Sequence, residues 1–177
     1  MINKIIIISF GQIEREIIDK AISALKKQFK VEIEFFQELP IPWFAERNGQ
    51  MKAVDFLVCE REILENNGAE AILGITKKDL FMPNFQFVFG LANPLEKTAI
   101  VSLNRLFDLN RQSYFKRIQK EVIHEIGHLF NLGHCHNFQC VMSFSNNIKE
   151  VDKKSMALCA NCERIINAGR ISKKATI

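Results

Sequence analysis

The first part of the chain alternates between continuous apolar runs and hydrophobic residues at helical spacing. Residues 3–10 (NKIIIISF) contain four consecutive isoleucines and are followed by Gly11, a pattern typical of a buried strand. Apolar residues then recur at helical spacing from Ile13 to Leu25, which predicts an amphipathic helix. Residues 31–36 (VEIEFF) alternate before they end in two aromatic residues, and they predict a second strand.

A second helix and a third strand follow a break at two prolines. Pro40 and Pro42 interrupt the chain, and apolar positions at helical spacing then predict a helix over residues 51–67. Gly68 is suited to end that helix, because glycine readily adopts the left-handed conformation found at helix C-termini. The segment 69–76 (AEAILGIT) has the composition of a strand.

The remaining elements complete a mixed architecture. Residues 85–91 and 98–103 predict two more strands, joined by the turn sequence ANPLEK. Helical spacing returns over residues 113–131 and, near the end of the chain, over residues 155–168. About five strands with helices between the early ones place the chain in the α/β (α+β) class.

Composition and charge indicate an ordinary globular protein. A chain of 177 residues suits one domain, and 47% hydrophobic and 25% charged residues exclude a disordered chain. The formal net charge of +4 is too small to imply binding to nucleic acid. The isoleucine run is too short for a secretory signal or a membrane span, so we expect no membrane association and a cytoplasmic location, where thiols stay reduced.

All four histidines lie in one short segment, HEIGHLFNLGHCH. His124 and His128 are four residues apart in the helix predicted for 113–131, so both imidazoles lie on one face and can reach one ion at roughly 2 Å. Glu125, turned by about 100°, lies beside such an ion and can take a proton from its water. His134 can supply a third ligand if the chain doubles back after the helix. The segment therefore predicts a catalytic metal site, although two surface histidines on a helix would give part of the same pattern.

Zinc is the expected ion, because three neutral imidazoles and an open fourth position suit it. Iron or nickel can occupy such a site in vitro. The ion would lower the pKa of its water towards 7 and polarise a carbonyl group, while Glu125 accepts the proton. This chemistry predicts hydrolysis of an amide bond.

The cysteines indicate a second metal site. Cys135 and Cys140 bracket four residues, and eighteen residues later Cys159 and Cys162 form a CxxC pair. Two short chelate loops joined by a longer one are typical of a structural tetrahedral thiolate site for zinc. A redox-active CxxC pair or buried small hydrophobic residues are the alternatives. His136 could replace a cysteine ligand or face the substrate, but we expect it to be exposed to solvent.

The two predicted ions are close but separate. Because His134 and Cys135 are adjacent, their Cα atoms are about 3.8 Å apart, and the reach of both side chains puts the ions roughly 8–13 Å apart. The two sites therefore share no ligand.

The combined pattern resembles the archaemetzincins, a family of metzincin zinc metallopeptidases. The metzincin signature is HExxHxxGxxH, and the archaemetzincin pattern adds a cysteine, then CxM, then a distant CxxC. The positions of this sequence that match are His124, Glu125, His128, His134, Cys135, Cys140, Met142, Cys159 and Cys162. Asn131 stands where the family has glycine, and Gly133 follows two residues later. Asparagine tolerates the left-handed conformation, so we expect the helix exit to survive at a cost of about 1 kcal/mol.

The resemblance implies a fold and a division of the chain. It implies a metzincin-like, mixed, mostly parallel five-stranded sheet with a backing helix and an active-site helix. Residues 1–134 would form the N-terminal subdomain, and residues 135–177 a smaller C-terminal subdomain that carries the Met-turn and the four-cysteine zinc site, together one catalytic domain. Met142 would be the Met-turn residue beneath the histidines, and a simple core methionine is the alternative.

The resulting hypothesis is a zinc-dependent metallopeptidase with two Zn²⁺ ions per chain, one catalytic and one structural. Because strand-like sequence begins by residue 3, we expect no inhibitory pro-segment, and hence short peptides or unfolded termini as substrates in an aminopeptidase-like mode. We expect a monomer that binds peptide or protein substrates and no nucleic acid. The alternatives are a zinc-stabilised binding module with a vestigial histidine site, and hydrolysis of a different amide or an ester.

Three further expectations concern the surroundings of the site. Residues 85–91 (FQFVFGL) are either a sheet edge that receives an extended peptide or a core strand. Tyr114 lies ten residues before His124, too far along the helix to stabilise an oxyanion. Asp152, Lys153 and Lys154 are expected to be solvated.

Overall fold

The computed structural model describes residues 2–43 and 46–171, except for the side chains of Arg170 and Ile171. Residues 172–177, which the predicted C-terminal subdomain includes, lie outside the described residues. The helices and strands, in chain order, are β1 (Lys4–Phe10), α1 (Arg15–Phe29), β2 (Glu32–Leu39), β3 (Gln50–Lys52), α2 (Ala53–Glu65), β4 (Ala71–Thr76), β5 (Asp79–Met82), β6 (Phe85–Val88), β7 (Gly90–Asn93), β8 (Thr98–Ser102), α3 (Arg111–Leu129), α4 (Ile148–Lys153) and α5 (Ala160–Ile171).

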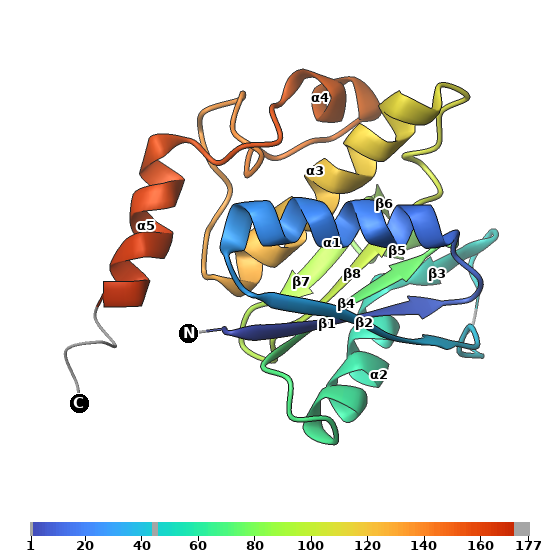
Figure 1. Cartoon of the computed structure of the whole chain (residues 1–177). Coiled ribbons are helices and arrows are strands. Elements are labelled where there is room, and N and C mark those ends of the chain that lie inside the picture. The colour runs from blue at the N-terminus through green and yellow to red at the C-terminus, as the bar shows by residue number, and fades with distance from the viewer. Residues whose placement is uncertain (1, 44–45, 172–177) are drawn as a thin grey trace.

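A five-stranded sheet forms the centre of the molecule, as predicted (Figure 1). Its strand order is β2-β1-β4-β8-β7. The first four strands run parallel, and β7 pairs antiparallel with β8 at one end of the sheet. Since β1, β4 and β8 are buried along nearly their whole length, both faces of the sheet must be covered.

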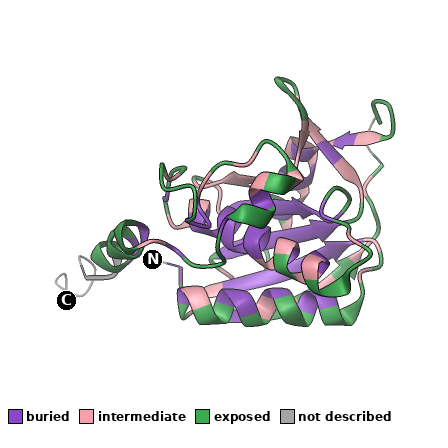
Figure 2. Ribbon diagram, turned by 90° about the horizontal axis from the view of Figure 1, so that it is seen from above, coloured by how far each residue is buried: buried purple, intermediate pink, exposed green. Residues whose placement is uncertain are grey.

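Helices cover the two faces of this sheet unequally (Figure 1). One face packs against α1 and α3, whose apolar sides join the sheet in the larger hydrophobic core. The other face packs against α2 in a smaller core. Figure 2 shows buried residues gathered on the sheet and on the helix sides that face it, while the outer helix faces are exposed. The long helix α3 is thereby held over β7 and β8, at the antiparallel end of the sheet.

The structure corrects several predicted boundaries in the middle of the chain. The helix predicted for 51–67 is shorter, because residues 50–52 form strand β3 and α2 spans Ala53–Glu65. The strand predicted for 85–91 is two strands in two sheets, since β6 pairs with β5 in a three-stranded sheet and β7 joins the main sheet. Short strands of this kind are fixed by tertiary pairing rather than by their own periodicity.

The helix predicted for 155–168 begins five residues later, at Ala160. Ser155 explains the delay, because its amide donates to Gln139 O at 2.8 Å and its hydroxyl accepts from the amide of Ala157 at 3.1 Å. Such side-chain bonds to the local backbone compete with helix formation. Segment 155–157 therefore packs against the loop before Met142 instead of starting the helix.

No helix in the described ranges is long and apolar enough to cross a membrane.

Glu60 is an unexpected member of the smaller core. It lies on α2 with no exposed surface, and its carboxyl group occupies the space left by the missing side chain of Gly74 on β4. Burial raises the pKa of Glu60 well above its ordinary value of 4.5, while the amides of Ala99 and Gly74 act in the opposite direction. The folded protein therefore holds this proton more tightly than the unfolded chain.

This burial predicts a pH dependence of stability. Below pH 4.5, Glu60 is protonated in both the folded and the unfolded protein, and its contribution to the free energy of unfolding is fully present. This contribution is lost as the pH rises toward the raised pKa of Glu60 in the folded protein. Glu60→Gln removes the ionisable group, so its free energy of unfolding relative to wild type should increase between about pH 5 and pH 8. Urea unfolding at several pH values measures this difference. Glu62→Gln, an exposed position on the same helix, is the control and should show a constant difference.

Candidate metal centre and catalytic site

Helix α3 carries the first part of the site. Its N-terminus is capped by Asn110, whose side chain accepts a hydrogen bond from the amide of Ser113 at 3.0 Å. Apolar residues at helical spacing then bury one side of the helix against the sheet, and His124 and Glu125 are each only 5% exposed. The helix therefore brings both polar side chains into the protein rather than leaving them at the surface.

The end of α3 turns the chain back toward the helix. Asn131 has φ +63°, so it adopts the left-handed conformation predicted for it. Its amide donates to His128 O at 2.8 Å, and the amide of Leu132 donates to Gly127 O at 3.1 Å. These two bonds are the Schellman arrangement. The side chain of Lys97 also donates to Leu129 O at 2.8 Å, so the carbonyl groups of the last turn have partners and the exit is well defined.

The turn brings the three predicted histidines together. Their candidate ligand nitrogens all lie within 4.8 Å of one another. The ring centroid of His134 is 5.4 Å from that of His124 and 5.0 Å from that of His128. His124 is buried, His128 is half-buried and His134 is exposed, so the group opens to one side. One side of the imidazole cluster is therefore available to a ligand.

Backbone carbonyl groups fix the orientation of the two helical imidazoles. His124 Nδ1 lies 2.9 Å from Val141 O, and His128 Nδ1 lies 2.8 Å from Leu132 O. Because a carbonyl oxygen only accepts, both Nδ1 atoms carry the proton and both Nε2 atoms present lone pairs. Burial lowers the pKa of all three histidines, which favours the neutral form.

The two Nε2 atoms, of His124 and His128, are 3.1 Å apart. Two lone pairs this close repel unless a cation lies between them. Two nitrogen ligands at roughly 2 Å from a tetrahedral ion are about 3.3 Å apart. The imidazoles therefore fit zinc, with His134 placed as the candidate for a third ligand.

Met142 packs against α3 at Gly127, the residue before His128. It has no exposed surface, and a Cβ atom on Gly127 would lie 2.9 Å from its Cε. Gly127 therefore lets Met142 approach the helix between the two histidine positions. Sequence reasoning missed Gly127, although a glycine inside a helical pattern is a recognisable signal of close packing.

Glu125 occupies a buried position under the edge of the sheet. Burial raises the pKa of its carboxyl group well above its usual range, the charge of Glu121 adds to the shift, and Lys154 opposes it. A Cβ atom on Gly90 would lie 2.6 Å from Glu125 Oε1 and 2.7 Å from its Cγ. Gly90, at the start of β7, therefore provides the space for this carboxyl group, and it is a second residue that sequence reasoning missed.

The prediction that Lys154 is solvated is wrong. Lys154 is 2% exposed, and its Nζ forms an ion pair with Glu121 Oε1 at 2.9 Å. Asp152 is exposed, as predicted, and its carboxylate also accepts two hydrogen bonds of 2.7 Å from Arg117, which the sequence did not indicate. Lys153 is exposed, as predicted.

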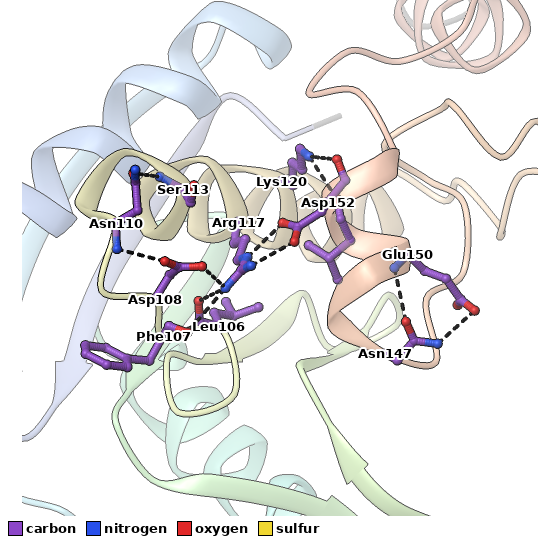
Figure 3. A network of polar contacts seen from close by, with 11 residues as sticks. Leu106, Phe107, Asp108, Asn110, Ser113, Arg117, Lys120, Asn147, Glu150 and Asp152 are labelled. Carbon is purple, nitrogen blue, oxygen red and sulfur yellow. Dashed lines mark hydrogen bonds and ion pairs between the residues drawn. The ribbon is translucent and has the colours of Figure 1, made fainter.

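Figure 3 shows the contacts that hold α4 against α3. These contacts explain the burial of Lys154, the residue that follows α4. Arg117 donates hydrogen bonds to the carboxylate of Asp152, and its Nη1 lies 2.9 Å from Asp108 Oδ2. Lys120 Nζ donates to Val151 O at 2.8 Å and to Asp152 O at 2.9 Å. Two successive turns of α3 thus hold α4, and Lys154 follows directly at its C-cap. No sequence periodicity reveals this contact, because α4 has only six residues.

A cavity of about 500 Å³ opens beside the histidines. Its apolar wall comes from β6, β7 and Phe144, whose ring centroid lies 4.9 Å from that of His134. Tyr114 is absent from the lining, in agreement with its predicted distance from the site. The charged and imidazole side chains of the lining are Glu121, His124, Glu125, His128, His134 and Lys154.

The four predicted cysteines form the second cluster. Their sulfur atoms all lie within 4.8 Å of one another, with Cys135 and Cys159 at 3.7 Å and Cys140 and Cys162 at 3.8 Å. Sulfur ligands about 2.3 Å from a tetrahedral zinc are about 3.8 Å apart, so the cluster fits that ion. A hydrogen bond from the Cys162 amide is the largest cause that lowers the pKa of Cys159 to about 7. His136 is exposed, as predicted.

This architecture defines a class of protein. The sheet is mostly parallel with one antiparallel strand, and a helix that packs on it bears HExxH. A third histidine follows the sharp helix exit, and a buried methionine packs against the helix at Gly127. Together these features define the metzincin class of zinc metallopeptidases.

Comparison with known proteins identifies the family. The model of peptidase family M54 matches residues 47–168, and the chain belongs to this family. It is 46% identical to the archaemetzincin of Pyrococcus horikoshii over 126 residues, which cover 68% of this chain and 66%, slightly under two thirds, of that relative. It is 33% identical to the archaemetzincin of Pyrococcus furiosus over 177 residues, which cover 93% and 92% of the two chains.

A solved structure supports the same relationship. The crystal structure of archaemetzincin from Methanopyrus kandleri aligns with a TM-score of 0.86 and 32% identity, over 95% of each chain. The resemblance read from the sequence is therefore confirmed, and with it the fold.

The left-handed conformation of Asn131 predicts that replacement by glycine stabilises the protein slightly. Asn131→Gly should raise the free energy of unfolding by about 0.5–1 kcal/mol, because glycine adopts positive φ without a steric penalty. Asn131→Val should lower it, since a β-branched residue is strained in this conformation. Chemical denaturation of the three metal-loaded proteins measures the order. Equal stabilities would show that the exit does not need the left-handed conformation.

Gly90→Ala should displace the carboxyl group of Glu125 and leave the histidines in place. Under the peptidase function proposed below, with Glu125 as general base, peptide hydrolysis should fall by at least about tenfold, because a small misplacement of a catalytic group is costly. Metal content should not change. Crystal structures and rate measurements test both points. Gly133→Ala is the matched control, since no atom other than those of the neighbouring residues in the chain lies within 4 Å of the new Cβ.

Proposed function

We propose that the protein is a zinc-dependent peptidase in which His124, His128 and His134 hold the catalytic ion and Glu125 is the general base. The observation that carries this proposal is the pair of Nε2 lone pairs held 3.1 Å apart beside a buried carboxyl group and an open cavity. A bound zinc ion supplies Lewis acidity and lowers the pKa of the attacking water.

Glu125 moves the proton in this mechanism. Its carboxylate accepts a proton from the attacking water and passes it to the nitrogen of the leaving amine. Gly90 lets the carboxyl group reach this position, and the apolar wall of the cavity keeps bulk water away from it. His124 and His128 stay in one tautomer throughout, because Val141 O and Leu132 O hold their Nδ1 protons.

The end of the sheet offers a place for an extended substrate. Within the described residues, β7 ends the five-stranded sheet, and residues 85–92 line the cavity together with the histidines. A peptide backbone can add to such an edge as a further strand, which gives binding without demanding a particular sequence. Phe85 is half exposed and lies 6.5 Å, between ring centroids, from Phe144, so these two rings can contact the substrate side chains.

The cavity volume supports short peptides or unfolded termini as substrates, in an aminopeptidase-like mode. A space of about 500 Å³ holds a few side chains and excludes a folded loop. The four-cysteine cluster holds a second, structural zinc ion in this proposal, and it anchors the C-terminal subdomain of residues 135–177 to the N-terminal part of residues 1–134. Cysteines that bind a metal rather than form disulfides are typical of the cytoplasm, which is the location we propose. We also propose that the protein is a monomer.

The deciding experiment combines metal analysis with peptide cleavage. The purified wild type should contain two zinc ions per chain and cleave members of a peptide library. Glu125→Ala should keep both ions and lose about 10²–10⁴-fold in rate, because it removes the general base. Glu62→Ala, an exposed position, is the control. If the wild type and Glu125→Ala are equally inert while nucleic acid binds with a steep salt dependence, the binding-module alternative replaces the peptidase.

A further inference from the structure

The thiolate cluster and the histidine group are joined at two points along the chain. His134 is followed directly by Cys135, so a histidine and a cysteine share one peptide bond. Cys140 is followed directly by Val141, whose carbonyl oxygen accepts the Nδ1 proton of His124 at 2.9 Å. A movement of either cysteine therefore moves a group that belongs to, or orients, the histidine group.

Hydrogen bonds connect the same segments a second time. The amide of Val141 donates to Ala157 O at 3.0 Å, and Ala157 lies two residues before Cys159. The amide of Cys159 in turn lies 3.2 Å from the sulfur of Cys140. Val141 is thus held between His124 on one side and the CxxC segment on the other.

Met142 takes part in this arrangement. Its carbonyl oxygen accepts a hydrogen bond from the amide of Cys135 at 2.9 Å, and its side chain packs on Gly127 of α3. The two cysteine-bearing ends of the loop, at Cys135 and Cys140, are therefore fastened to each other through the Met-turn. The loop of residues 135–140 keeps this conformation only while Cys135 and Cys140 stay close together.

Electrostatics makes that closeness depend on a cation. The sulfur pairs are 3.7 and 3.8 Å apart. Without a cation these sulfur atoms are either thiolates, which repel one another at such distances, or thiols, which hold one another only through weak hydrogen bonds. A divalent ion removes this repulsion and holds all four ligands at fixed distances. In the absence of a cation the segments that carry the cysteines should separate, and Val141 and His134 should move with them.

We infer that a metal ion at Cys135, Cys140, Cys159 and Cys162 positions His124 and His134, so that the two metal sites bind their ions cooperatively. This inference rests on the proposed assignment of both groups as metal sites. The cysteines are positioning residues, acting through Val141 O and through the His134–Cys135 peptide bond. Because coupling between binding sites is reciprocal, the ion at the histidines should strengthen binding at the thiolates by the same factor.

Cobalt distinguishes the two sites by spectrum. Co²⁺ bound to thiolates gives an intense sulfur-to-metal charge-transfer band, whereas Co²⁺ at the imidazoles gives only weaker bands in the visible range. Titration of the metal-free wild type with Co²⁺ therefore reports the affinity of each site separately. The same titration of the double variant Cys159→Ser, Cys162→Ser should show histidine-site affinity reduced by at least about tenfold.

The matched control is Cys59→Ser, a cysteine on α2 outside the cluster, which should behave as the wild type. Circular dichroism establishes that the double variant is folded. Equal histidine-site affinity in a folded double variant and in the wild type would overturn the inference and leave the proposed peptidase intact. Absence of cobalt binding at the histidines in the wild type would instead overturn the proposed function.

A second measurement uses the wild type alone and does not depend on the folding of a variant. One equivalent of Cd²⁺ fills the thiolate cluster, because cadmium prefers sulfur ligands. Nuclear magnetic resonance then follows the Nδ1 proton of His124, which Val141 O accepts. Its exchange with water should slow by at least about tenfold relative to the metal-free protein, and an unchanged exchange rate would contradict the coupling.

Discussion

Two hydrogen bonds from imidazole Nδ1 atoms to backbone carbonyl oxygens decide the chemistry of this site. They fix which nitrogen of His124 and of His128 carries the proton, and so they turn both Nε2 lone pairs toward one point. Neither acceptor lies inside α3: Leu132 follows the helix exit, and Val141 belongs to the loop before Met142. The helix supplies the correct spacing of the two histidines, but the segments after the helix make them a donor pair for a cation. A well-formed exit is therefore as necessary as the motif itself.

The site concentrates buried charge, and the fold balances it in pairs. Glu121 and Glu125 lie one turn apart on α3, and both are buried. Without a counter-charge two carboxylates at this spacing would repel, and Lys154 reduces that repulsion through its ion pair with Glu121. A cation at the imidazoles would add a further positive charge beside Glu125. The network of Arg117, Lys120 and Asp152 places Lys154 at this position, so an apparently peripheral contact between α3 and α4 shapes the electrostatics of the cavity.

The sequence was most informative where the chemistry depends on local spacing. The separation of His124 from His128, the left-handed residue Asn131 and the grouping of the cysteines all follow from helix geometry and ligand preference, and the structure places them accordingly. It was least informative where a glycine matters because it has no side chain, or where a residue depends on a partner far away in the sequence. Gly90 and Gly127 matter because another side chain fills the space that they leave, and Lys154 is buried because α4 docks on α3. The division of residues 85–91 between two sheets likewise depends on pairing with β5 and β8, which no local pattern encodes.

The loop after α3 therefore has two functions that constrain one another. It must expose His134 and leave the cavity open, yet it must also keep Val141 and Met142 fixed against the helix. Its apolar residues alone do this at only a few positions, since Val141 and Met142 are fully buried while the flanking residues 136–139 are exposed. The cation that we propose at the four cysteines would fasten both ends of such a loop without a large hydrophobic core. In this proposal the closed thiolate cluster therefore makes the loop rigid. The open cleft beside it cannot do so, because it must leave room for a substrate.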